Sequence, residues 1–380
     1  MRETQPGTDD VSTRRKFLVN SGAVSAVALA GCIGDAESDA GSETSGGSGG
    51  AGSDSPTYPD LDPDNPEFPQ SFGTLMDASL DSASLVELDE MEVRDEPRYG
   101  NPVQELGADE EPIRPDPLVF TWAPTEDPAG YEDTFDVLRS NLEAELDVDV
   151  ETFVTEDYAS QVEAMRAERL HVARFATGNT PYGVNLAGAQ PFAMPVEGDQ
   201  FGVRVWTVAR ADNDNINSPA DLAGLDRVAH GPPTSNSGNL APTALLPDQG
   251  VTPGEDYEIE NTGSHENVIM SVVNNDFEAG NGCSTCMFRA LDNRGVDLDD
   301  IKVVWASDAF PLGPISLRYN LADDIKQGVR NALMDYDYEG TPLDTDIGYK
   351  SFVEIDYATH WDTVLQIQEF NDVEYRDSGL

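Results

Sequence analysis

One short stretch carries polar groups suited to holding an anion: Ser235, Asn236, Ser237 and Gly238. It follows a segment expected to form a strand, residues 227–230, and a helix is expected after it. The first N–H groups of a helix lack internal partners, and the helix dipole places a partial positive charge there. With the hydroxyls and the amide, these groups would suit a tetrahedral oxyanion. Ordinary helix capping is the alternative interpretation, because Ser and Asn are favoured capping residues.

Other candidate residues also follow expected strands. His265 comes after Gly263 and Ser264 at the start of another helix and could donate to an oxyanion, although a structural hydrogen bond explains a lone His equally well. Thr125, Tyr158 and Tyr182 stand where open α/β sheets bind ligands. Aromatic residues at such positions also serve as core or rim, so these three are weaker candidates.

The cysteines support no metal or disulfide framework. The chain has three, Cys32, Cys283 and Cys286, which are too few for a four-ligand zinc site. The last two have a redox spacing that leaves a local disulfide, structural thiols and a catalytic pair open. No GxSxG, HExxH or phosphate-binding P-loop motif is present. We therefore expect no cofactor, no metal and no catalytic residue.

The elements that would position these residues begin at residue 117. Apolar segments predict strands near 118–122, 148–154, 171–175, 204–210, 227–230, 303–306 and 315–318. Helical spacing of apolar residues lies between them, for example over 131–146, 267–274 and 323–334. This alternation predicts an α/β fold with a mostly parallel sheet.

Residues 1–116 predict an export signal and a tether. Arg14-Arg15 precedes an apolar run over 19–30, which is typical of twin-arginine signal peptides. The run ends in Leu29-Ala30-Gly31-Cys32, which resembles a lipobox and predicts a lipid on Cys32 after removal of residues 1–31. A plain signal peptide with an incidental Cys is the alternative. Residues 32–116 are acidic and rich in Gly, Ser and Pro, which predicts a tether. Whether residues 57–116 wrap the folded part or extend is left open.

The net charge restricts the partners. The 380 residues include 72 Asp and Glu but only 22 Lys and Arg, for a net charge of −50. Such a chain lacks the cationic surface that nucleic acid or anionic lipid requires. Excess acid is found in disordered chains and in folded proteins from high salt. The 38% apolar content and the scarcity of Lys favour the second, so we expect an extreme halophile.

Taken in order, the motifs resemble the phosphate/phosphite/phosphonate substrate-binding proteins of ABC transporters, the PhnD-like family. The resemblance covers about residues 117–375 and rests on Phe120-Thr121-Trp122-Ala123-Pro124-Thr125-Glu126-Asp127, Asp157-Tyr158-Ala159, Gly178-Asn179-Thr180-Pro181-Tyr182, Ser235-Asn236-Ser237-Gly238, Gly263-Ser264-His265 and Val304-Trp305-Ala306-Ser307. It implies a type II periplasmic-binding-protein fold, with two α/β lobes joined by two crossing strands and the ligand cleft between them. Lobe one would span 117–209 and 310–380, and lobe two 210–309. The crossings would fall near 208–211 and 307–310.

The resemblance also implies a function. The protein would be an extracellular receptor, lipid-anchored after twin-arginine export, that captures a phosphorus oxyanion and delivers it to an ABC permease and its ATPase. It would act as a monomer and break no bond. Ser235, Asn236, Ser237 and His265 would hold the ligand from lobe two, and Thr125, Tyr158 and Tyr182 from lobe one. We expect hydroxyl and N–H donors, rather than Lys or Arg, to supply the affinity.

Two departures from the family pattern matter. The family's Ser-Thr-Ser is replaced by Ser235-Asn236-Ser237, which keeps a donor at the middle position. The acid often found near residues 283–285 is absent. An ammonium group would lack its carboxylate there, so we expect phosphate, phosphite or a simple phosphonate to fit better than 2-aminoethylphosphonate.

Two alternatives remain open from the sequence. The same fold could bind a sulfonate, nitrate or a thiamine-pathway pyrimidine. An enzyme acting on pyrimidines would need a nucleophile in the cleft, for which Cys283 is the candidate.

Overall fold

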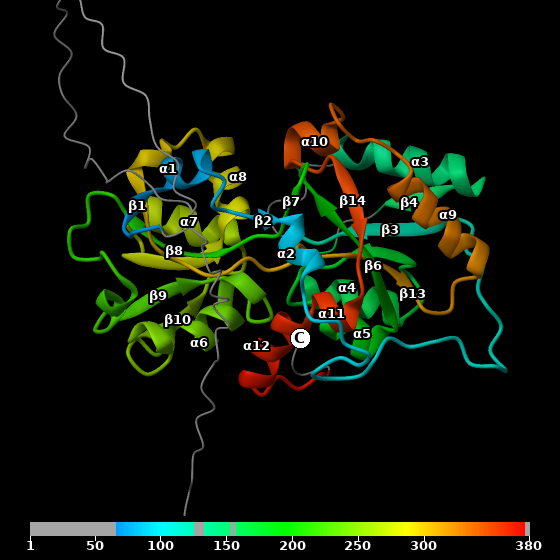
Figure 1. Cartoon of the computed structure of the whole chain (residues 1–380), viewed down its shortest axis with the longest axis horizontal. Coiled ribbons are helices and arrows are strands. Elements are labelled where there is room, and N and C mark those ends of the chain that lie inside the picture. The colour runs from blue at the N-terminus through cyan, green and yellow to red at the C-terminus, as the bar shows by residue number, and fades with distance from the viewer. Residues whose placement is uncertain (1–65, 125–132, 153–154, 156, 377–380) are drawn as a thin grey trace, which may run out of the picture. The chain divides into compact units, whose positions relative to one another are not determined.

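The computed structural model describes residues 66–124, 133–152, 155 and 157–376. The strands in these residues form two six-stranded sheets and one two-stranded sheet (Figure 1). Sheet I has the order β14 (Ser351–Glu354), β6 (Ala189–Val196), β13 (Ile315–Arg318), β5 (Val172–Arg174), β3 (Leu118–Trp122), β4 (Val150–Thr152). Sheet II has the order β1 (Gln70–Ser71), β12 (Ile301–Ala306), β8 (Val205–Arg210), β11 (Ala279–Cys283), β9 (Arg227–His230), β10 (Glu258–Asn261). The small sheet pairs β2 (Ala83–Ser84) with β7 (Gln200–Phe201).

Both large sheets are mixed, so the expectation of a mostly parallel sheet is wrong. In sheet I, β3 runs parallel to β4 and β5, but β13 is antiparallel to β5 and β6. In sheet II, β9 runs parallel to β10 and β11, whereas β8 is antiparallel to β11 and β12. The antiparallel strands lie next to the points where the chain leaves one sheet for the other. Periodicity alone does not reveal these exchanges.

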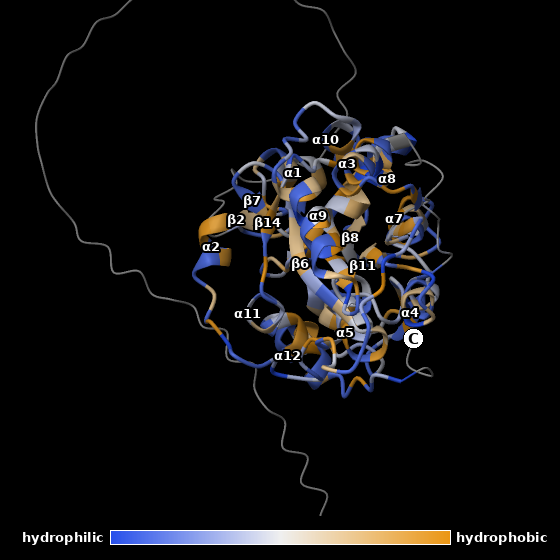
Figure 2. Ribbon diagram, turned by 90° about the vertical axis from the view of Figure 1, so that its right-hand side faces the viewer, coloured by the Kyte–Doolittle hydropathy of each residue, from blue (hydrophilic) through white to orange (hydrophobic). Residues whose placement is uncertain are grey.

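Helices pack on both sheets. The α-helices of the described residues are α1 (Phe72–Asp77), α2 (Leu85–Asp89), α3 (Asp136–Leu146), α4 (Tyr158–Arg166), α5 (Thr180–Ala187), α6 (Ala241–Leu245), α7 (His265–Val273), α8 (Ser284–Arg294), α9 (Asp323–Met334), α10 (Pro342–Ile347), α11 (Tyr357–His360) and α12 (Asp362–Phe370). Short tighter or wider turns are η2 (Asp133–Phe135), η3 (Pro219–Leu222), η4 (Asn236–Leu240), η5 (Leu246–Gln249) and η6 (Leu298–Asp300). Helix α12 carries both hydrophilic and hydrophobic residues along its ribbon (Figure 2). Among the described helices, none combines the length and apolar character needed to cross a bilayer.

Each sheet has its own apolar core. In sheet I, Leu118 and Phe120 of β3 pack with Leu142 of α3 and Val329 of α9, and all four are buried. In sheet II, Trp206 of β8 is fully buried beside α7, α8 and the N-terminal helix α1. Separate cores let two lobes move as rigid bodies about the segments that join them.

The joining segments pair with each other between the sheets. The chain leaves sheet I after Val196 of β6 and enters sheet II at Val205 of β8. Between them, the backbone N–H of Val203 donates to Phe310 O at 2.9 Å, and that of Phe310 donates to Val203 O at 2.8 Å. Strand β8, which includes residues 208–210 of the expected crossing, pairs within sheet II.

Residues 66–116 lie against the folded part where the structure describes them. Strand β1 extends sheet II by pairing with β12, and Phe72 of α1 packs edge to face on Trp206 with ring centroids 4.7 Å apart. Further along, the Arg98 guanidinium pairs with Asp362 at 2.7 Å. Arg114 then pairs with Asp324 of α9 at 2.7 Å. Residues 66–116 thus contact elements of both sheets. They wrap the folded part rather than extend from it, which the sequence alone had left open.

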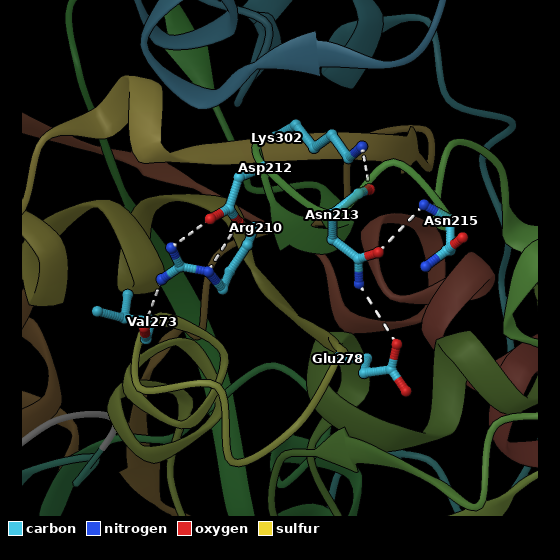
Figure 3. A network of polar contacts seen from close by, with 7 residues as sticks. All are labelled: Arg210, Asp212, Asn213, Asn215, Val273, Glu278 and Lys302. Carbon is cyan, nitrogen blue, oxygen red and sulfur yellow. Dashed lines mark hydrogen bonds and ion pairs between the residues drawn. The ribbon is translucent and has the colours of Figure 1, made fainter. Parts of the chain in front are cut away.

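A polar network fastens the turn after β8 (Figure 3). The Arg210 guanidinium donates to Asp212 through two bonds of 2.9 Å and to Val273 O at 2.8 Å. The buried Lys302 ammonium of β12 donates to Asn213 O at 2.7 Å. Burial lowers the pKa of Lys302, and the acids around the turn oppose that shift. One of the chain's few Lys residues therefore has a structural role at this turn.

Candidate ligand site

A small cavity between the two sheets brings together most of the expected site residues. Its volume is about 30 Å³. A cavity needs roughly 10–15 Å³ to hold one water, so this one takes a ligand core of only a few atoms. Its lining comprises Tyr158, Arg174, Ala176, Thr177, Gly178, Val203, Ser235, Asn236, Ser237, His265, Cys283, Cys286 and Leu312.

The Ser235 hydroxyl is oriented by two neighbours. Ser235 caps η4, and its Oγ accepts from the Gly238 N–H at 3.1 Å. His265, the first residue of α7, accepts the Cys283 N–H at Nδ1 over 3.3 Å, so the neutral ring carries its proton on Nε2. That Nε2 lies 3.2 Å from Ser235 Oγ and donates to it. With two bonds accepted, the Ser235 hydroxyl proton is left to donate to a ligand. His265 therefore orients Ser235.

Asn236 is a buried amide in the lining of the same cavity. Its side chain is 3% exposed, and neither Oδ1 nor Nδ2 has a hydrogen-bond partner among the residues that the structure describes. An unsatisfied buried amide costs roughly 1–3 kcal/mol, so native proteins seldom leave one unless something binds there. Ser237, 7% exposed, lines the same cavity beside it. Within this stretch, the capping bond is made by Ser235, whose Oγ accepts from the Gly238 N–H.

Two close backbone approaches shape the cavity wall. A Cβ on Gly178, which follows β5, would lie 2.5 Å from Asn236 N and closer still to Thr234 O. A Cβ on Gly238 would lie 2.8 Å from the Cα of Gly231, whose N–H donates to Gly238 O at 2.9 Å. The contact at Gly178 brings a loop of sheet I against a loop of sheet II across the cavity. Only glycine permits it.

Of the two expected aromatic residues, one lines the cavity and the other does not. Tyr158, buried at the start of α4, lines the cavity, and its carbonyl accepts from Asn179 Nδ2 at 3.1 Å. Tyr182 is outside the lining: its ring packs edge to face on Tyr375 at 5.3 Å, and burial raises its pKa to about 12. Thr125 lies outside the described residues.

The cavity also contains a cation that was not expected. Arg174, the last residue of β5, is 4% exposed and belongs to the lining. The expectation that no Arg would contribute donors overlooked it, because Val172, Ala173 and Arg174 form one buried strand. An Arg at the end of an otherwise apolar buried strand was the available signal.

Cys283 and Cys286 form a disulfide at the start of α8. The pair lines the cavity with sulfur and carries no free thiol. Within the ranges that the structure describes, no group of three His, Cys, Asp or Glu side chains could hold a metal ion.

The loop that carries Ser235–Ser237 rests on a buried polar network. His230 is fully buried, and its Nδ1 donates to Asn239 Oδ1 at 3.1 Å. Its Nε2 accepts from Asn281 Nδ2 and from the Tyr257 hydroxyl, each at 3.0 Å. Burial lowers the pKa of His230 to about 4, so the ring is neutral at physiological pH. The loop that carries Ser235–Ser237 is thus held in place by neutral side chains.

Residues 120–361 match the family model described as "ABC transporter, phosphonate, periplasmic substrate-binding protein". The chain belongs to this family. Its members are transport binding proteins, not enzymes, which removes the pyrimidine-processing alternative. The disulfide at Cys283 agrees, because it occupies the thiol that would have been the nucleophile.

Two known proteins are similar in sequence to this chain over part of their length. The phosphate-import protein PhnD of Mycolicibacterium smegmatis is 33% identical over 208 residues, which cover 51% of this chain and 64% of the relative. The phosphonates-binding periplasmic protein of Escherichia coli is 25% identical over 223 residues, covering 58% and 66% respectively. The matches thus span slightly less than two thirds of each relative.

Solved structures confirm the periplasmic-binding-protein fold. A binding protein component of an ABC phosphonate transporter from Pseudomonas aeruginosa has a TM-score of 0.60 and 22% identity, covering 69% of this chain and 90% of that one. PhnD1 from Prochlorococcus marinus, solved with methylphosphonate, has a TM-score of 0.59 and 17% identity, covering 68% and 99%. At these identities the likeness concerns the fold: two α/β lobes with the ligand cleft between them.

Proposed function

We propose that this protein is the extracellular substrate-binding component of an ABC importer, capturing a phosphorus oxyanion and delivering it to the membrane permease and ATPase. The observation that carries the proposal is the buried, unpartnered Asn236 amide in a cavity with the hydroxyls of Ser235 and Ser237. Family membership adds the transport context. The proposed ligand contacts are Ser235, Asn236 and Ser237 on one side and Tyr158 on the other, with His265 acting through Ser235.

The proposed order of preference follows from the cavity lining. Phosphate, phosphite and methylphosphonate offer only oxyanion oxygens or a small apolar group. 2-Aminoethylphosphonate adds an ammonium, and no carboxylate belongs to the described residues that line the cavity. A second cavity, which shares Leu312 with the first, does include Asp81 and Glu197. We expect the simple oxyanions to bind more tightly, because a buried ammonium without its counter-charge is costly.

Isothermal calorimetry at molar salt tests both points. The wild type is titrated with phosphate, phosphite, methylphosphonate, 2-aminoethylphosphonate, sulfate and nitrate. Ser237→Ala should weaken phosphorus-oxyanion binding, whereas Ser351→Ala on β14 serves as the matched control and should not. Equal binding by Ser237→Ala and the wild type would disprove the site. Tightest binding of the aminophosphonate would overturn the ligand preference, and a best ligand without phosphorus would overturn the function.

The anchoring is proposed from the sequence alone. The twin-arginine pattern and the Leu29-Ala30-Gly31-Cys32 lipobox support export followed by a lipid on Cys32, outside the described residues. Cys32→Ser should move the protein from the membrane pellet to the medium. Wild-type and variant protein found together in the pellet would contradict the anchor. The proposed monomer is checked on the released protein by light scattering.

The proposed habitat is high salt. It is supported by a net charge of −50, of which −32 falls on residues 117–380. Since salt screens repulsion among carboxylates, we expect the unfolding temperature to rise steeply from dilute buffer to molar KCl. A protein equally stable in both would argue against halophilic adaptation.

We also propose the lobe boundaries. Sheet membership supports ending the first part of lobe one near 196–203, rather than at 209, because β8 pairs within sheet II. Lobe two would then run to about 306, and lobe one would resume by β13.

A further inference from the structure

Arg174 is a buried cation that has no anionic partner within the part of the chain that the structure describes. Its side chain lies in the cavity lining at 4% exposure, and its Nε has no hydrogen-bond partner. Among the described residues, no carboxylate oxygen lies within ion-pairing distance of it. The comparably buried Arg318 differs, since its guanidinium pairs with Glu168 at 3.0 Å. In a chain with 72 acids, a buried Arg without one is a specific feature.

Neutral groups fix the direction of the Arg174 guanidinium. It lies over the ring of Trp122, with Cζ 5.4 Å from the centroid. Trp122 is itself stacked on Phe135 at 4.5 Å. The Tyr349 hydroxyl accepts from Nη2 at a long 3.4 Å. These contacts orient the cation and leave its charge uncompensated.

Such an arrangement costs stability unless an anion completes it. A guanidinium stays protonated when buried, so it cannot relieve the cost by losing its proton. Burying an unpaired charge is expensive, and a cation–π contact offsets only part of that cost. A small anion bound in the cavity would offset this cost.

We propose that Arg174 is the residue that selects the ligand's charge: it binds an oxyanion from sheet I while Ser235, Asn236 and Ser237 bind it from sheet II. The inference rests on the proposed function and narrows it to oxyanions that carry two negative charges and no ammonium. Guanidinium groups match such oxyanions through parallel, charge-assisted hydrogen bonds. The neutral donors of Ser235, Asn236 and Ser237 on the opposite wall would then discriminate between ligands by shape rather than by charge.

The test is calorimetry with methylphosphonate, phosphate and sulfate on the wild type, Arg174→Gln and Arg174→Lys. Removing one partner of a buried charge pair should weaken the best ligand by at least about 30-fold in Arg174→Gln, with partial recovery in Arg174→Lys. Arg227→Gln is the matched control, because Arg227 also lies over a ring, that of Phe277 at 4.4 Å, but outside the cavity lining. It removes the same charge and should bind normally.

Two further readouts separate ligand binding from a structural role. Wild-type affinity for methylphosphonate should rise with pH as the ligand loses its second proton, and this slope should flatten in Arg174→Gln. Without ligand, Arg174→Met should unfold at the same temperature as the wild type or higher, since it removes an unpaired buried charge.

The outcomes are distinguishable. Wild-type affinity and an unchanged pH slope in Arg174→Gln would overturn the role of Arg174 while leaving the proposed function standing. Sulfate could bind the wild type most tightly and lose this binding in Arg174→Gln. That result would support Arg174 as the anion-binding residue and overturn the phosphorus specificity. A large loss of ligand-free stability in Arg174→Met, with binding retained by Arg174→Lys and by any folded Arg174→Gln, would make the residue structural.

Discussion

Replacing Gly178 by Ala should uncouple ligand binding from stability. Gly178 follows β5 of sheet I and meets the loop of sheet II that carries the proposed ligand contacts. An added Cβ would lie 2.5 Å from Asn236 N and 3.2 Å from Asn236 Cα. The obstructing atoms belong to backbone, so no side-chain rotation can relieve the contact. The two loops would have to separate by a few tenths of an ångström or more.

The size of the effect follows from the cost of overpacking. Forcing extra methyl volume into a close contact costs typically about 1–3 kcal/mol. If the proposed hinge closure forms this contact, the cost falls on the closed, ligand-bound state and not on the open one. Since about 1.4 kcal/mol is a tenfold change in affinity, Gly178→Ala should weaken oxyanion binding roughly 5- to 150-fold.

The assay compares calorimetric affinity with ligand-free unfolding temperature in molar salt. Gly107→Ala is the matched control, because its Cβ would meet only the Glu110 side chain at 3.3 Å. We expect Gly178→Ala to lose affinity and keep its ligand-free stability. Unchanged affinity would refute the argument. A loss of ligand-free stability equal to the loss of affinity would show that the contact persists without ligand and that closure does not form it.

Three further predictions concern stability and the site. The pKa of His230 is about 4 in the folded protein against 6.5 in the unfolded chain. Its contribution to the free energy of unfolding is therefore complete above pH 6.5 and falls by about 3 kcal/mol as the pH drops toward 4. Denaturant unfolding should show this pH dependence in the wild type but not in His230→Gln. Phe72→Ala should cost about 3–5 kcal/mol of unfolding free energy because Phe72 is fully buried, whereas Val86→Ala, at 60% exposure, should cost under about 0.5 kcal/mol; equal effects would show that residues 66–89 do not belong to the folded unit. Tyr182→Phe should leave oxyanion affinity unchanged, since its ring contacts Tyr375 outside the cavity; a loss of about tenfold or more in calorimetry would bring Tyr182 back into the site.

The local elements around the site were predictable because each has a local cause. Ser235 ends an extended segment and caps a turn, and Ser264 caps the helix that begins at His265. Apolar spacing over residues 131–146 and 323–334 predicted two helices, and α3 (Asp136–Leu146) and α9 (Asp323–Met334) lie there with their inner faces packed on sheet I. Such features need only neighbours a few residues away, so a single sequence contains them.

Features that depend on distant parts of the chain were not predictable. The Pro- and acid-rich composition of residues 66–116 indicates a tether, yet Phe72 and Leu75 are buried against sheet II. Their burial depends on a surface more than a hundred residues away, so no local period reveals it. Strand β8 joins sheet II for the same kind of reason, since its partners β11 and β12 come later in the chain.

The position of Arg174 bears on how so negative a protein can capture an anion. The donors on sheet II are neutral, and the network behind them is neutral as well, because His230 loses its charge on burial. Those groups alone would not offset the repulsion of the −32 carried by residues 117–380. In the proposed site the Arg174 guanidinium, which has no ion-paired carboxylate among the described residues, would do so locally, within the few ångströms where burial prevents screening. Because Arg174 and the neutral donors sit on different sheets, an anion is fully coordinated only when both close on it, which is how ligand charge would drive closure.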